Sequence, residues 1–330
     1  MDNYKTIEAI LKPVIIKARI IQSSFLRRIF ASSKIKIKKM LRFKADIKSV
    51  IFMIITTALL FTQWNLKSFN VFLYIWYLYM SVTVAVMAHN HNHLPMWKNK
   101  ILNIFTDWWL TFFYGFPVFG WIPTHNKNHH KLNNKEGDYT ITYRVSEKNN
   151  LLTIISYPSI SSYYQQKVMG DYLREVKAKN VNQYYLCLVQ IAVLIIFTAV
   201  GFIIDWKKAL YFIIIPQQFS MFSVLIFNYI QHVHADEESE YNHSRNFVGI
   251  TNFFLLNNGL HTIHHDKAGL HWSETPTEHK KIEPKIDPSL IEHSFWWYIV
   301  RVYFLGIFIP QLRTKSKRLE RMRRTRQTTT

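Results

Sequence analysis

Apolar and charged positions alternate along this chain in long blocks rather than residue by residue. Four blocks contain no Lys, Arg, Asp or Glu and are long enough to cross a bilayer, which takes about 20 helical residues. They run over 49–66, from 68 through 93, over 180–204 and over 209–231. Very short turns join the first block to the second and the third to the fourth. We therefore expect an all-α, multi-pass membrane protein with two transmembrane helical hairpins, that is, four spanning helices.

Three further apolar segments, 101–123, 151–166 and 295–309, are not expected to span. The first is interrupted by Asp107 and by Gly and Pro residues, the second is short, and the third carries Arg301 in its middle. We expect all three to form helices that lie in the membrane interface.

Charge refines this topology. The net charge is +20, and the basic residues gather at the ends: residues 1–48 hold 13 Lys/Arg against 3 Asp/Glu, and 313–326 hold 8 against Glu320 alone. In a soluble protein this excess of basic residues would suggest binding to nucleic acid. Beside apolar blocks it instead indicates terminal segments that face anionic lipid, so no nucleic-acid partner is expected. The positive-inside rule places both termini in the cytoplasm.

These patterns divide the chain into three parts. Residues 1–48 form a basic segment on the membrane surface, 49–310 form the transmembrane domain with a cytoplasmic helical cap, and 311–330 form a basic tail.

Histidines supply the candidate chemistry, because they recur at spacings of one, three and four. Residues three or four apart share one face of a helix, so each cluster can direct two or three imidazoles at one point. The single cysteine, Cys187, lies in an apolar run and is read as a buried side chain. The clusters are His89, His91 and His93; His125, His129 and His130; and His261, His264 and His265.

The expected topology brings these clusters to one depth. His89 lies 21 residues beyond Ser68, and His232 lies 23 residues beyond Ala209, so both leave their helices near the same cytoplasmic level. The second and third clusters belong to cytoplasmic segments. Asn228 precedes His232 by one turn and is expected to orient a ligand or a bound water.

So many imidazoles exceed the needs of one ion and suit a His-rich site for two metals. Neutral imidazole binds zinc, copper, iron and nickel, but zinc has no redox chemistry. A two-metal site at the mouth of a membrane bundle, facing a lipid-like substrate, therefore suggests iron and O2.

At this point the chain resembles the integral-membrane fatty acid desaturases, whose histidine boxes read H-x3-4-H, H-x2-3-HH and H-x2-HH with paired transmembrane helices between them. The resemblance covers roughly residues 50–280. In membrane acyl-CoA desaturases, a histidine four residues after an asparagine on the fourth helix is also a ligand, and Asn228 and His232 resemble that pair. The ligands implied by the resemblance are His89, His93, His125, His129, His130, His232, His261, His264 and His265.

The resemblance implies two iron ions (Fe2+/Fe3+), with O2 as co-substrate and a cis double bond introduced into an acyl chain. The substrate would be an acyl-lipid, acyl-CoA or acyl-ACP. Electrons would come from an external ferredoxin-like or cytochrome b5-like donor. The expected location is a bacterial inner membrane, with the active site on the cytoplasmic side. The aromatic-rich segments 72–79 and 105–121 are candidates for the walls of the acyl channel.

Two alternatives remain open. The same di-iron plan supports a hydroxylase or ketolase of a carotenoid, alkane or sphingolipid. A histidine-rich metal transporter or binding protein is a different class, but transporters place polar ligands near the bilayer midplane, where these four helices carry no histidine or acidic residue.

Other polar residues receive smaller roles. His91 could belong to the ligand pair of its cluster but points away from the face shared by His89 and His93. His271 lies close to the third cluster and could support its ligands, but it is interpreted as a solvated interfacial side chain. Carboxylates that could orient ligand imidazoles are Asp138, Asp236 and Asp266, of which Asp266 is expected to face solvent. The histidines expected at the surface are His234, His243, His279 and His293.

Overall fold

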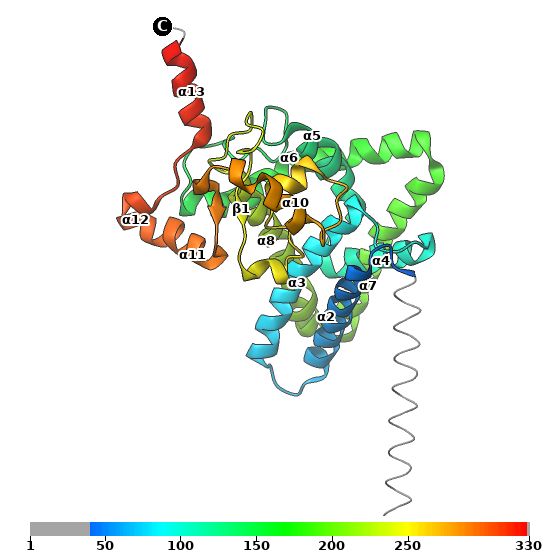
Figure 1. Ribbon diagram of the computed structural model, residues 1–330. Helices are drawn as coiled ribbons and strands as arrows, with labels where there is room; N and C mark the ends of the chain where they lie inside the picture. The colour runs from blue at the N-terminus through cyan, green and yellow to red at the C-terminus, as the bar shows by residue number, and fades with distance from the viewer. Residues whose placement is uncertain (1–39, 329–330) are drawn as a thin grey trace, which may run out of the picture.

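The computed structural model describes residues 40–328 and is almost entirely helical (Figure 1). Most of the basic segment expected at 1–48 lies outside the described residues. The strands among the described residues are the two-residue β1 (Asn246–Phe247) and β2 (Ile291–Glu292), which pair in parallel. The expectation of an all-α protein is confirmed.

The first hairpin consists of α2 (Ile47–Asn65) and α3 (Val71–His93). Both helices are largely apolar, apart from Lys48 near the start of α2 and the polar residues that end α3. The turn between them ends at Asn70, whose side chain accepts a hydrogen bond from the backbone N–H of Leu73 (3.1 Å) and thereby caps α3.

The second hairpin runs through α7 (Val181–Ala209), the π-helical segment η4 (Leu210–Ile214) and α8 (Ile215–His232). The helical run of 52 residues is broken at Asp205, whose φ of −160° and ψ of 100° are extended. Beyond the break the chain folds back, so that Gly201 lies directly against Ile213.

Contacts between the two hairpins place their turns at one end of the bundle. Lys208 donates from Nζ to the carbonyl of Trp64 (2.6 Å), and Tyr77 donates its hydroxyl to the carbonyl of Phe212 (3.0 Å). Farther along, Ser220 donates to the carbonyl of Ser81 (2.7 Å). The opposite ends, where α3 and α8 finish at histidines, therefore lie together. Within residues 40–328, three helices are long and apolar enough to cross a membrane: Lys44–Asn65, Val71–His93 and Val181–His232.

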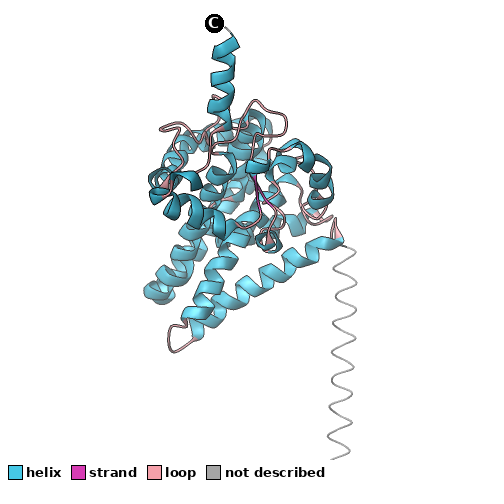
Figure 2. Ribbon diagram, turned by 60° about the vertical axis from the view of Figure 1, so that its left-hand side comes forward, coloured by secondary structure: helices cyan, strands magenta, loops and turns pink. Residues whose placement is uncertain are grey.

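The remaining helices form a cap over the histidine end of the hairpins, and Figure 2 shows the hairpin helices extending from one side of this cap while α13 projects from the other. The α-helices of the cap are α4 (Lys100–Tyr114), α5 (His130–Leu132), α6 (Leu151–Lys179), α9 (His261–Asp266), α10 (Thr275–Ile282), α11 (Phe295–Ile299), α12 (Gly306–Phe308) and α13 (Lys317–Thr328). The 3-10 and π segments are η1 (Lys44–Asp46), η2 (Val118–Gly120), η3 (Ile122–His129), η5 (Ile250–Phe253), η6 (Glu283–Lys285), η7 (Pro288–Leu290), η8 (Val300–Leu305) and η9 (Pro310–Leu312).

The three apolar segments of the cap are helical, as expected, but the prediction of a short helix at 151–166 was wrong. The helix α6 has 29 residues and continues through Pro158. A capping box between Asn150 and Thr153 begins it, and Asn180 ends it while also capping α7. A proline inside a helix removes one backbone hydrogen bond, and here that loss does not end the helix.

Candidate metal centre

The structure brings together all nine histidines that the sequence singled out as ligands. They come from the last turns of α3 and α8, from η3 and the first residue of α5, and from α9. They form two groups, and in each group the candidate ligand nitrogens lie within 4.8 Å of one another. The first group is His89, His93, His125, His130 and His264; the second group is His129, His232, His261 and His265.

Helix geometry explains how neighbouring histidines reach different groups. The π-helical turn of η3 brings residues five apart onto one face, so Nε2 of His125 and Nε2 of His130 lie 3.0 Å apart in the first group. His129 then points to the second group. In α9, His261 and His265 are four apart, and their Nε2 atoms lie 3.2 Å apart in the second group.

The nitrogens of the first group converge on one another. Nε2 of His130 lies 3.0 Å from Nε2 of both His125 and His264, and Nε2 of His89 lies 2.8 Å from Nε2 of His125. In a neutral imidazole each ring nitrogen either donates one proton or offers one lone pair, so Nε2 of His130 cannot form hydrogen bonds with both of these neighbours at once. The convergence of lone pairs fits a cation.

The Nε2 atoms of the second group converge in the same way. Nε2 of His232 lies 3.2 Å from Nε2 of His129 and 3.0 Å from Nε2 of His261. Burial, together with the neighbouring imidazoles, lowers the pKa of His261 and His265 well below its usual value. The rings are therefore neutral at pH 7, which is the form that binds a metal.

In the second group, hydrogen bonds at Nδ1 fix the orientation of two imidazole rings, those of His129 and His232. Nδ1 of His129 donates to Oδ2 of Asp138 (2.7 Å), and Nδ1 of His232 donates to the backbone carbonyl of His243 (3.2 Å). Because a proton sits on Nδ1, the lone pair of each Nε2 is left for a ligand. The expected contact between Asp138 and a ligand imidazole is confirmed.

Asp138 is held as a carboxylate. Burial alone would raise its pKa, but the imidazole of His129 and hydrogen bonds from Thr140 hold the pKa below its usual value. Oδ1 accepts from both the N–H and the hydroxyl of Thr140, and Oδ2 also accepts from the N–H of Asn134.

His91 does not join either group. Its Nδ1 accepts from the backbone N–H of Met96 (3.2 Å), and its Nε2 lies 3.4 Å from a carboxylate oxygen of Asp107. The expectation that His91 faces away from the face of His89 and His93 agrees with this geometry.

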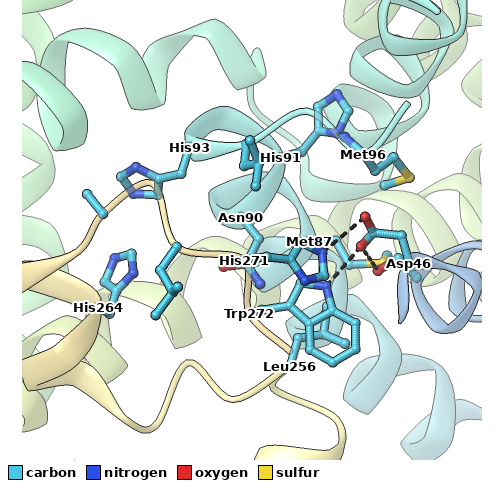
Figure 3. Close-up of a pocket in the computed structure, with 14 residues that line it drawn as sticks. Asp46, Met87, Asn90, His91, His93, Met96, Leu256, His264, His271 and Trp272 are labelled. Carbon is cyan, nitrogen blue, oxygen red and sulfur yellow. Dashed lines mark hydrogen bonds and ion pairs between the residues drawn. The ribbon is translucent and has the colours of Figure 1, made fainter. Parts of the chain in front are cut away.

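The prediction that His271 is solvated was wrong, and Figure 3 shows its ring beside Asp46 and Trp272. The side chain is buried, stacks on Phe43 with ring centroids 4.0 Å apart, and places Nε2 3.1 Å from Oδ2 of Asp46. Trp272 donates to the other oxygen of Asp46 (2.9 Å). The loop after α9 thus packs on the start of α2, a contact between residues too distant in the chain for their spacing to predict.

The surface assignment was also wrong for His243 and His279, which are buried, and His234 is partly buried, whereas His293 is exposed as expected. The cause is tertiary packing. Nε2 of His243, for example, lies 3.2 Å from Oδ1 of Asp266.

The two remaining carboxylates do not touch ligand imidazoles. Asp266 pairs with His243 and is exposed to solvent, as expected. Asp236 pairs with Arg321 of α13, whose Nε lies 2.7 Å from Oδ1, so its suggested role in orienting a ligand was wrong.

A cavity of about 550 Å³ reaches both groups of histidines. His89 and His125 of the first group and His261 of the second lie in its wall. Asn228 also lines it and donates from Nδ2 to the hydroxyl of Tyr157 (2.7 Å). The side chain of Asn228 is therefore fixed beside the histidines.

Of the two aromatic-rich segments predicted to line the acyl channel, only one lines the cavity. From 105–121, Tyr114, Phe116, Phe119 and Trp121 line the cavity, whereas no residue of 72–79 appears among the lining residues. The contribution of α6 was missed, although its lining residues recur at the spacing of one helical face: Ser162, Gln165, Gln166, Met169 and Leu173.

Comparisons with known proteins agree with this geometry. No curated protein and no solved structure gave a match. The family model described as fatty acid desaturase matches residues 64–298, which include α3, the second hairpin and every histidine of the two groups. The chain therefore belongs to the fatty acid desaturase family.

Proposed function

We propose that this protein is a membrane fatty acyl desaturase that uses O2 to introduce a double bond into an acyl chain. Membership of the family implies oxidoreductase chemistry on a lipid or acyl substrate. The observation that carries the proposal is the position of both histidine groups at the wall of one cavity of about 550 Å³.

The donor set suits two ions, the first held by the five histidines around His130 and the second by the four around His232. Bound iron would supply the O2-dependent redox chemistry that removes hydrogen from unactivated methylenes, with electrons from an external ferredoxin-like or cytochrome b5-like donor. The all-nitrogen donor set is also the type that imidazole-binding metals such as iron prefer.

The protein's own contribution is to hold the chain and exclude water. The volume of the cavity is within the range of about 300–1,000 Å³ that is usual for small-molecule sites. Met169, Leu173 and Val224 give it apolar walls, and the ring of Trp121 lies 5.2 Å from that of His89 and 5.1 Å from that of His125. These walls would orient one pair of methylenes toward the histidines.

The hairpins support a membrane setting with four spans and a cytoplasmic cap. A helix of 52 residues would be about 78 Å long if straight, more than twice the hydrocarbon thickness, and the break at Asp205 divides it. Phe61, Phe72 and Ile203 expose their side chains on these helices and would face lipid. We place both termini and the active site on the cytoplasmic side of a bacterial inner membrane.

Lipid analysis tests the proposal. The chain is expressed in a host that lacks desaturases, and its fatty acids are separated by gas chromatography with localisation of double bonds. We expect new monounsaturated chains, their loss in His130→Ala and His264→Ala, and their retention in His293→Ala, whose side chain is exposed. Hydroxylated products without new double bonds would contradict the proposal in favour of a hydroxylase.

A further inference from the structure

The basic C-terminal tail is bound to the cap through ion pairs. Arg321 contacts Asp236 (2.7 Å) and Glu237 (2.9 Å), and Arg318 contacts Glu237 and, at 3.1 Å, Glu147. Asp236 and Glu237 follow His232 by only four and five residues. The tail therefore attaches to the stretch of chain that leaves the second histidine group.

Glu237 makes this attachment more than a surface contact. Its carboxylate is only 3% exposed and is shared by the two arginines. A buried carboxylate needs its cationic partners, because an uncompensated charge in the interior is strongly unfavourable. Removing the arginines is expected to displace the chain around Glu237.

His234 ties the tail to the same stretch independently of these charges. Its Nδ1 lies 2.8 Å from the hydroxyl of Thr314, and its Nε2 donates to the carbonyl of Glu147 (2.8 Å). Its own carbonyl accepts from the N–H of Lys317 (3.0 Å). The φ of His234 is +62°, a conformation uncommon outside glycine, which packing on both sides holds in place.

A movement of residues 233–237 would also displace His232. It is the last residue of α8, and Val233 already leaves the helix with a ψ of 131°. Ser316 and Arg318 of the tail line a small pocket together with His232 itself. A helix end without tertiary support frays, so the ring of His232 depends on the chain that follows it.

We propose that residues 313–321 act as a clasp that positions His232, so that metal affinity at the second histidine group depends on the C-terminal tail. This inference rests on the proposed metal centre. Residues of the clasp are positioning residues, because they act through His232 and do not touch a metal. Loss of a group that hydrogen-bonds a ligand directly lowers metal affinity by about 10–100-fold, and we expect the clasp, which acts one step farther away, to have an effect of at most this size.

Iron(II) titration under anaerobic conditions tests the clasp. The full chain is purified in detergent, and bound iron is counted per chain in the monodisperse fraction. We expect two tight sites in the wild type, and one tight and one weakened site in Arg318→Ala/Arg321→Ala. The matched control is Arg323→Ala/Arg324→Ala on the same helix, whose side chains are exposed; it should keep two tight sites. A purely structural role would lower the yield or thermal stability without changing the count per folded chain.

Two further variants test the clasp if Arg318→Ala/Arg321→Ala folds poorly. Thr314→Val removes the hydroxyl beside His234 without burying a charge, and adding Glu237→Gln to the arginine pair removes the unpaired carboxylate. Each should weaken one site only. Two unchanged sites in all these variants would overturn the clasp while leaving the proposed function intact, and equal weakening of both sites would also overturn it. A wild type that binds no iron would refute the proposed function and the clasp together.

Discussion

Replacing Asp138 by asparagine tests how far the second histidine group depends on a buried carboxylate. The side chain is completely buried, and each of its oxygens accepts two hydrogen bonds. Oδ2 accepts from His129 (2.7 Å) and the N–H of Asn134 (2.8 Å), and Oδ1 accepts twice from Thr140 (both 2.7 Å). The –NH2 of asparagine would face two donors in either orientation.

The expected cost follows from these contacts. Hydrogen bonds to a charged group contribute about 1.5–3 kcal/mol each, so losing two costs about 3–6 kcal/mol if the site does not relax. His129 also loses the partner that keeps its proton on Nδ1. We therefore expect iron affinity at the second group to fall by about 10–100-fold, or about 1.4–2.8 kcal/mol. The first group, which Asp138 does not contact, should be unchanged.

Anaerobic iron(II) titration and thermal unfolding measure both effects on the same sample. Asp266→Asn is the control, because Asp266 pairs with His243 and is 34% exposed on its side chain. Wild-type affinity at both sites in Asp138→Asn, with unchanged thermal stability, would refute the reasoning that this carboxylate orients His129.

Three further predictions follow from the site and its surroundings. Burial lowers the pKa of His125, His261, His264 and His265, so at a pH below about 6.5, the usual pKa of histidine, the unfolded chain binds more protons than the folded one. The stability of the metal-free protein should therefore fall as the pH decreases below about 6.5. An unfolding temperature that is flat or rises from about pH 7 to about pH 5 would contradict this. In Gly120→Ala, the added Cβ would lie 2.4 Å from Cε1 of Phe116 and 3.1 Å from Cε of Met169, both of which line the cavity; the product profile should shift toward shorter acyl chains, and an unchanged profile would show that this wall does not limit the substrate. If an acidic electron donor docks on the basic cytoplasmic surface, turnover at limiting donor should fall as salt rises, whereas salt-independent turnover would argue against electrostatic docking.

The sequence predicted the all-α fold and the two helical hairpins because helical periodicity is a local property. The pairs His89/His93 and His261/His265 share a face in any α-helix, and the break between the third and fourth apolar blocks was visible in the charged residues around Asp205. The length of α6 was not predictable in the same way, since Pro158 is a poor but tolerated helix residue.

The division of the histidines into two groups could not be predicted from spacing. His125 and His130 are five apart and fall on different faces of an ordinary α-helix; only the π-helical turn of η3 aligns them. Tertiary contacts also decide the partners of Asp138 and the burial of His271. These depend on the path of loops, for which local sequence carries little information.

Anomalous scattering at the iron edge, from crystals of the anaerobically reconstituted protein, tests most directly whether the two histidine groups bind iron. We expect two iron peaks, one among the five histidines around His130 and one among the four around His232. A single peak, peaks away from these imidazoles, or sites that take up zinc and no iron would contradict this expectation.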